Sequence, residues 1–169
     1  MTVQKLIKET IDRIYSAFEI PRHQPINLDE FLNTLNIQLH ESEELIYEGK
    51  IEKDYNDNTI ITIKYNHNEG RRRFTIAHEL GHYFLHFNDE DKEFKDSVFY
   101  RNLEYNNEEI EANEFAANLL MPEEEYKAFA EKNAYNQESN TYDVKKIAEY
   151  FRVSRQAAIY RGKNLNVFR

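Results

Sequence analysis

His78-Glu79-Leu80-Gly81-His82 places two histidines four residues apart, with a glutamate directly after the first. Residues at this spacing on an α-helix lie about 40° apart around the axis and one turn apart along it. Both imidazoles can therefore reach one metal ion, with Glu79 beside it as a general base. The alternative is a core helix with two hydrogen-bonded histidines. A chance match is expected only about 0.03 times in a chain of this composition, so metal binding is favoured.

The helix that carries this motif is expected to be buried, because residues 74–87 are apolar on nearly every side. Burying a glutamate and two histidines is costly unless something pairs with them, and a divalent cation would pair with all three. Gly81 costs about 1 kcal/mol relative to alanine inside a helix. Its expected purpose is to leave room for another backbone or a substrate.

A third metal ligand is needed, because catalytic zinc usually takes three protein ligands and a water. The chain has no cysteine, so the third ligand must be His, Asp or Glu. His86 lies eight residues after His78, about 12 Å along the axis, which is too far for both to bind one ion. We expect His86 to support the ligands, to face a substrate or to be structural.

A second helix is predicted over residues 107–121, where apolar residues recur at helical spacing before Pro122. Glu109 lies in line with Ala112 and Asn113, on a face of small residues that can approach the metal helix closely. Glu109 is therefore the expected third ligand, and Asn113 a possible hydrogen-bond partner of a ligand.

Other glutamates share the first turn of this helix. Glu108 is the fallback ligand, and Glu111 falls on a more solvated stripe. An acidic first turn is also favoured by the helix dipole alone, which explains some of these residues.

The segments Arg71–His86 and Glu109–Pro122 together resemble the ImmA/IrrE family of zinc metallopeptidases. The resemblance implies that His78, His82 and Glu109 bind Zn²⁺ and that Glu79 is the general base. It also implies a cytoplasmic peptidase with a narrow protein substrate. That substrate is typically a helix-turn-helix repressor encoded beside the peptidase, often on a prophage or another mobile element.

The remaining sequence predicts an α+β fold, a minimal thermolysin-like zincin with a small antiparallel or mixed sheet packed on helices. Amphipathic helices are expected at 3–18 and 28–35, a strand near 37–40, and a hairpin formed by 45–53 and 59–65. Strand 59–65 could edge the cleft and pair with an extended substrate, or be an ordinary strand. The connection 88–107 joins the two ligand helices and is expected to border the cleft.

The C-terminal part has the pattern of a helix-turn-helix. After a helix at 123–131 and a polar loop at 133–141, a helix, a turn at 152–154 and a second helix capped by Ser154 are expected. We divide the chain into a zincin-like domain, residues 1–138, and a helix-turn-helix-like unit packed on it, residues 139–169.

The distribution of charge along the chain suggests an alternative function, DNA binding. Residues 143–169 carry a net charge of +5, whereas the whole chain carries −9. A basic helix-turn-helix can read DNA, but this unit is short, and the acidic body opposes phosphate binding. Direct nucleic-acid binding is therefore not favoured. Arg71, Arg72 and Arg73 could hold an acidic part of a substrate, with pairing inside the protein favoured, so Arg71 and Arg73 stay substrate-contact candidates.

Length and composition fit one domain with a core: 169 residues, 40% hydrophobic and 14% aromatic. No apolar run near 18 residues and no signal-peptide layout is present, so we expect no membrane association. The absence of cysteine permits the cytoplasmic location that the family resemblance implies. The predicted function is a zinc-dependent endopeptidase acting on a specific regulatory protein. The alternative is a DNA-binding or partner-sequestering regulator with a structural metal site.

Overall fold

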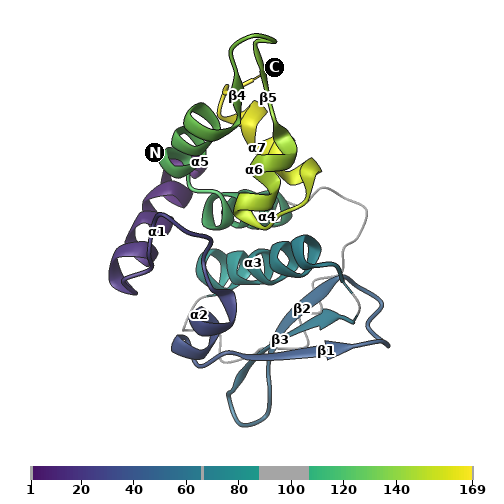
Figure 1. The fold of residues 1–169 in the computed structure, drawn as a ribbon. Helices are drawn as coiled ribbons and strands as arrows, with labels where there is room; N and C mark the ends of the chain where they lie inside the picture. The colour runs from purple at the N-terminus through teal and green to yellow at the C-terminus, as the bar shows by residue number, and fades with distance from the viewer. Residues whose placement is uncertain (1, 66, 88–106, 169) are drawn as a thin grey trace.

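The structure, a computed structural model, describes residues 2–65, 67–87 and 107–168. It has an α+β fold, as the sequence predicts, and the helix α3 (Glu69–His86) lies between a small sheet and the helix α4 (Asn107–Leu120) (Figure 1). The expectation for the connection 88–107 falls almost entirely outside the described residues. Within the described part of the chain, no helix is long and apolar enough to cross a membrane.

The sheet is mixed and has the order β1-β3-β2. Strand β3 (Thr59–Lys64) runs parallel to β1 (Gln38–Ser42) and antiparallel to β2 (Gly49–Lys53), so the predicted hairpin is confirmed. The idea that strand 59–65 edges the cleft is wrong, because β3 is the central strand. Its β-branched run suits that place, with Ile61 and Ile63 fully buried. The edge strand that packs against α3 is β2.

The N-terminal helices begin at capping side chains. Thr2 accepts a hydrogen bond at the start of α1 (Val3–Ala17), and Asn27 does so at the start of α2 (Leu28–Thr34). Helix α1 packs on α4, where the Tyr15 hydroxyl donates to the carbonyl of Leu119 at 2.8 Å.

The segment after α4 differs in detail from the expectation. Helix α5 (Glu123–Phe129) passes into a π-helical turn, η1 (Ala130–Ala134). The predicted polar loop 133–141 is instead closed by a small hairpin of β4 (Tyr135–Asn136) and β5 (Thr141–Tyr142). Turn chemistry explains the difference, since the Asn136 side chain accepts two backbone hydrogen bonds inside the loop.

The C-terminal unit is a helix-turn-helix, α6 (Val144–Phe151) and α7 (Arg155–Asn164). Arg152 adopts the left-handed conformation at the turn, and Ser154 caps α7 by accepting from the backbone N–H of Ala157 at 3.1 Å. Helix α7 packs on the rest of the protein, where the Tyr126 hydroxyl donates to the carbonyl of Ala158 at 2.6 Å. The division at residues 138 and 139 stays a prediction.

Candidate metal centre

Helix α3 presents His78 and His82 on successive turns, with Glu79 directly after His78, in the interior of the protein. Their exposed fractions are 4%, 4% and 1%, so all three need partners inside the protein. Gly81 lies where α4 crosses α3, and a Cβ built there would fall 2.9 Å from the Cα of Ala112. The space that the missing side chain leaves at Gly81 is therefore occupied by the backbone of α4. This close crossing brings the first turns of α4 to the two histidines.

Glu109 of α4 completes a group of three ligand-bearing side chains. Its Oε1 lies 3.1 Å from His82 Nε2 and its Oε2 lies 3.4 Å from His78 Nε2. The two Nε2 atoms are 3.1 Å apart. A tetrahedral zinc ion with bonds of about 2.05 Å would separate its ligand atoms by about 3.3 Å. The spacing of these donor atoms, and their N, N, O chemistry, thus fit such an ion.

The electrostatics of this group favour the protonation states that a metal needs. Hydrogen bonds from His78 and His82 hold the pKa of Glu109 well below its usual range. Burial lowers the pKa of His82. An ionised carboxylate and a neutral imidazole are the forms that bind a cation.

Asn113 lies one turn after Glu109 and contacts His78. The Nδ1 of His78 lies 2.9 Å from Asn113 Oδ1, which can only accept. Nδ1 of His78 therefore carries a proton, and this bond holds the ring with Nε2 towards Glu109. This is the position in which the sequence places Asn113, as a hydrogen-bond partner of a ligand.

Gly49, which sequence analysis missed, borders Glu79. A Cβ at Gly49 would fall 2.5 Å from Thr75 Cγ2 and 2.8 Å from Glu79 Oε1. The first residue of β2 thus passes directly over the Glu79 carboxylate. A glycine inside a strand can mark a close approach of the backbone, and Gly49 lies within the strand expected over 45–53, so a signal was present in the sequence.

His86 and Glu111 extend the group on its other side. His86 Nδ1 lies 3.0 Å from His82 Nδ1, and His86 Nε2 lies 3.1 Å from Glu111 Oε2. Sequence analysis left the purpose of His86 open and assigned Glu111 to a solvated stripe. The structure instead places Glu111, half-buried, against His86.

The three arginines at the start of α3 bond within the protein. Arg71 Nε lies 2.9 Å from Glu48 Oε2, and Arg72 pairs with Asp29 and Glu41. Buried Arg73 donates to a backbone carbonyl at 2.9 Å. Pairing with acids of the protein itself, the interpretation that the sequence favours, is shown for Arg71 and Arg72, whereas Arg73 contacts a carbonyl. No separate observation supports Arg73 as a substrate contact.

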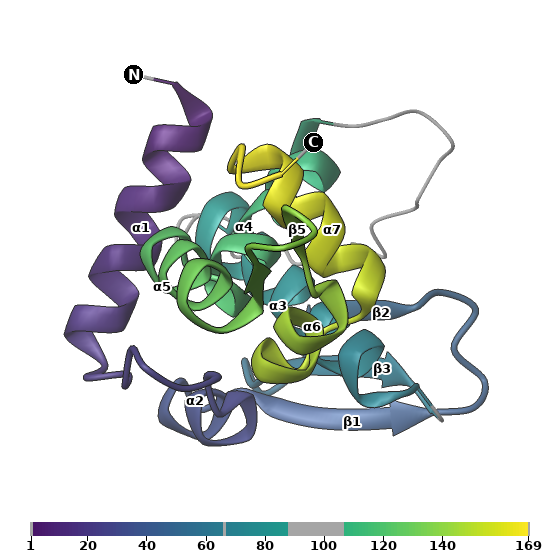
Figure 2. The ribbon, with the colours of Figure 1, turned by 45° about the horizontal axis from the view of Figure 1, so that its top comes forward.

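A groove of about 630 Å³ adjoins the metal centre. Its walls come from α3, α4 and α7, which lie side by side in Figure 2. Asn113 lines the groove and also contacts His78, so the groove lies on the other side of Asn113 from the centre. The exposed apolar side chains of Ile110 and Tyr160 stand on its α4 and α7 walls, and Phe74 lines it from α3.

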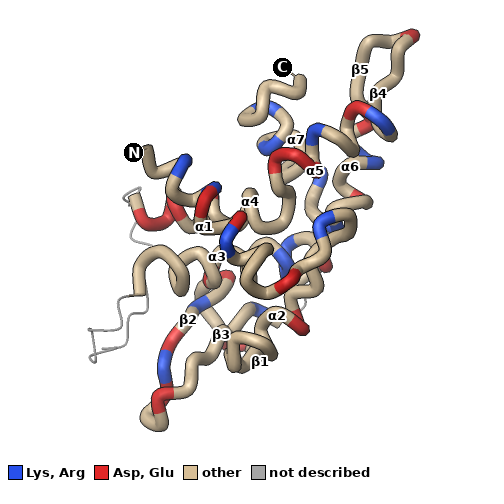
Figure 3. Tube along the Cα trace, turned by 90° about the vertical axis from the view of Figure 1, so that its left-hand side faces the viewer, with Lys and Arg blue, Asp and Glu red and all other residues tan. Residues whose placement is uncertain are grey.

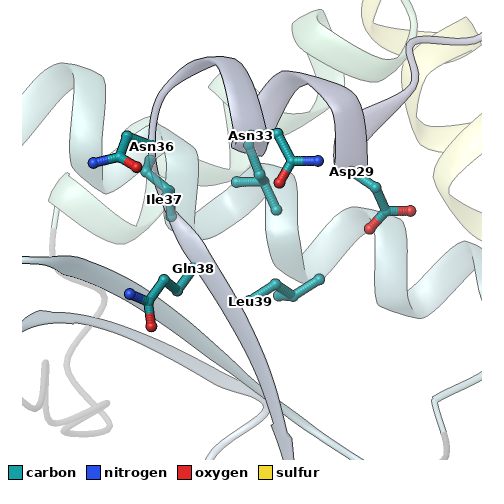
Figure 4. A pocket seen from close by; sticks show the side chains of 7 residues that line it. Asp29, Asn33, Asn36, Ile37, Gln38 and Leu39 are labelled. Carbon is teal, nitrogen blue, oxygen red and sulfur yellow. The ribbon is translucent and has the colours of Figure 1, made fainter.

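A smaller pocket of about 270 Å³ lies where α2 meets β1, the edge strand on the far side of β3 from β2 (Figure 4). Amide side chains dominate the close-up. The lining contains no histidine and one carboxylate, so we assign it no metal or catalytic role. The lining consists of Asp29, Leu32, Asn33, Asn36, Ile37, Gln38 and Leu39.

Comparisons with known proteins agree with this geometry. Residues 34–163 match the family described as IrrE N-terminal-like domain, Peptidase_M78. The chain is 30% identical over 118 residues to "Uncharacterized immunity region protein 2" of Bacillus phage phi105, covering 70% of each protein. A solved structure titled "Mycobacterium tuberculosis transcriptional regulator" matches with a TM-score of 0.52 and 18% identity. That match covers 92% of this chain and 50% of the other, and it supports the fold alone.

Proposed function

Because the chain belongs to the IrrE N-terminal-like family of peptidases, we propose that it is a zinc-dependent endopeptidase that cleaves a specific regulatory protein. The observation that carries the proposal is the convergence of two imidazole nitrogens and one carboxylate beside Glu79. In this proposal His78, His82 and Glu109 hold the ion. Bound there, zinc would supply Lewis-acid polarisation of a carbonyl and would increase the acidity of water.

Glu79 is the proposed general base. Its buried carboxylate is fixed between α3 and the start of β2, next to the ligand His78. It removes a proton from the water that attacks the substrate carbonyl and then returns this proton to the leaving amine.

The substrate has two proposed contact surfaces. The edge of β2 begins at Glu79 and can pair with an extended segment through backbone hydrogen bonds. The groove between α3, α4 and α7 can take apolar side chains next to the scissile bond. Its two charged lining residues are paired within the protein, Arg71 with Glu48 and Glu114 with Arg161, which favours an uncharged occupant.

A helix-turn-helix repressor is the proposed substrate. The similar phage protein is named for an immunity region, which supports a regulatory target. The net charge of −9 would attract a basic DNA-binding protein over a long range. A repressor acts on DNA inside the cell, so we place the peptidase in the cytoplasm.

Glu79→Gln tests the proposal. Co-expression with a helix-turn-helix protein encoded beside this chain, followed by intact-mass measurement, should show cleavage fragments with the wild type alone. The variant should keep stoichiometric zinc and cleave at least about 100-fold more slowly. Equal cleavage by the variant would remove Glu79 as the base.

Two other functions give different outcomes. A sequestering regulator with a structural metal would act unchanged as Glu79→Gln and would leave its partner intact. A DNA-binding protein would retard DNA in a salt-sensitive manner. Figure 3 shows Lys and Arg along α6 and α7, and three of these side chains pair with acids: Arg152 with Glu69, Lys145 with Glu149 and Arg161 with Glu114. These pairs offset part of the basic charge, which disfavours the DNA-binding alternative.

A further inference from the structure

A chain of two hydrogen bonds leads from the ligand His82 to a carboxylate on α4. The Nδ1 atoms of His82 and His86 are 3.0 Å apart, and His86 Nε2 lies 3.1 Å from Glu111 Oε2. The His86 side chain is 10% exposed and that of Glu111 is 29% exposed. The chain thus begins in the interior and ends near the surface.

The positions of the protons in this chain follow from its two ends. If His82 binds an ion through Nε2, its proton must be on Nδ1. It can donate that proton to His86 only if His86 Nδ1 carries a lone pair. His86 then carries its own proton on Nε2, where the Glu111 carboxylate accepts it. One carboxylate therefore fixes the tautomers of both rings.

The two histidine ligands differ in this respect. His78 donates to the neutral amide of Asn113, whereas His82 donates to an imidazole backed by a carboxylate. Partners of this kind orient a ligand ring and increase its basicity. The partners of His82 therefore orient its ring more strongly than Asn113 orients the ring of His78.

We propose that His86 and Glu111 are positioning residues that hold His82 in the orientation and tautomer required for metal binding. The inference rests on the proposed function for the presence of the ion. It assigns a purpose to Glu111, which lies on a different helix from both histidines.

The test is a double-mutant cycle on zinc affinity in the full chain, measured by competition with a chromogenic chelator. His86→Phe removes the link but keeps the carboxylate, and Glu111→Gln removes the carboxylate but keeps the ring. Each should weaken zinc binding by about 10- to 100-fold. The double variant should bind zinc no more weakly than the weaker of the two single variants.

Control experiments distinguish the loss of the hydrogen-bond chain from a change in net charge and from a loss of folding. Glu124→Gln makes the same charge change at an exposed site on α5 and should leave zinc affinity unchanged. Circular dichroism checks that each variant is folded, and Glu111→Asp gives a milder second variant that keeps the charge. Losses that multiply in the double variant, or unchanged affinity in both single variants, would overturn the inference.

A second readout needs no activity. Nitrogen-15 NMR of the zinc-loaded wild type should show the His82 proton on Nδ1 and the His86 proton on Nε2. The opposite tautomer of His86 would overturn the inference directly. If the protein binds zinc with this coupling but cleaves nothing, the proposed function fails while the positioning role stands.

Discussion

Gly49 of β2 lies directly against Glu79 of α3, and a Cβ on Gly49 would have no room there. None of the glycines has a positive φ among the described residues, so the requirement at Gly49 is for space and not for backbone conformation. Of the two neighbours, Glu79 has more rotatable bonds, whereas the β-branched side chain of Thr75 is stiff at χ1. Any side chain at position 49 therefore acts on the position of the proposed base.

Gly49→Ala is expected to displace Glu79 and to reduce cleavage by at least about 10-fold, since misplacement by about 1 Å can cost 100-fold. Steady-state cleavage of the substrate, with zinc content by mass spectrometry, would measure the effect. Zinc content should stay at the wild-type level, because the atoms nearest to a Cβ at Gly49 belong to Thr75 and Glu79 and not to a proposed metal ligand. Thr75→Ser removes the nearest atom and should partly restore activity when combined with Gly49→Ala. A wild-type rate in the single variant would contradict this account of Gly49.

The crossing of α3 and α4 sets the site at the scale of elements. The helices meet at Gly81 and Ala112, and the side chains that face each other across this contact include the proposed ligands. Helical spacing alone identifies the inward face of each helix. It does not fix the crossing angle, which decides how far each glutamate on α4 is from the histidines.

Gly81→Ala should destabilise the protein although alanine is the better helix former. The added methyl group would meet backbone atoms of Ala112 at 2.9 and 3.0 Å, so α4 would have to move. We expect a net loss of about 1–3 kcal/mol in the free energy of unfolding, in spite of about 1 kcal/mol gained in helix propensity. Urea unfolding measures this loss. Gly81→Ser is expected to reduce the free energy of unfolding further. Increased stability would show that the helices can separate freely.

At the scale of the whole molecule, distant elements are held together by side chains on the surface as well as in the core. Glu123 at the start of α5 accepts hydrogen bonds from Lys127 at 2.6 Å and from Lys8 of α1 at 2.8 Å. These bonds, Lys127 first, lower the pKa of Glu123 to about 2. The pair with Lys8 joins the N-terminal helix to the segment after α4.

Glu123→Gln should reduce the melting temperature in a pH-dependent way. A depressed pKa in the folded state means that the stabilisation is complete above the unfolded value of about 4.5 and is lost as pH falls towards 2. The difference in Tm between wild type and variant should therefore be largest above pH 5. The corresponding difference in the free energy of unfolding should remain small, about 1 kcal/mol or less, because the pair is partly exposed. Glu124→Gln is the matched control, and a difference independent of pH would contradict the assignment.

Helix α7 forms one wall of the groove and is therefore part of the proposed substrate-binding surface. Tyr160→Asp puts a charge into an apolar wall at a residue that is 60% exposed, so folding should be preserved. We expect the KM for the protein substrate to rise at least about 10-fold, with zinc content unchanged. Tyr55→Asp, at the tip of the β2–β3 hairpin and 97% exposed, is the control. Unchanged kinetics in Tyr160→Asp would exclude the groove from substrate binding.

The sequence by itself determined the local features. The helix with His78, Glu79 and His82, the hairpin, and the Ser154 cap follow from spacing and side-chain chemistry within a few residues. Only the tertiary structure decided that β2 is the edge strand at Glu79, that Gly49 must lack a side chain and that Glu111 contacts His86. These contacts join residues far apart in the chain, and their distances depend on strand order and helix crossing, which short-range periodicity does not specify.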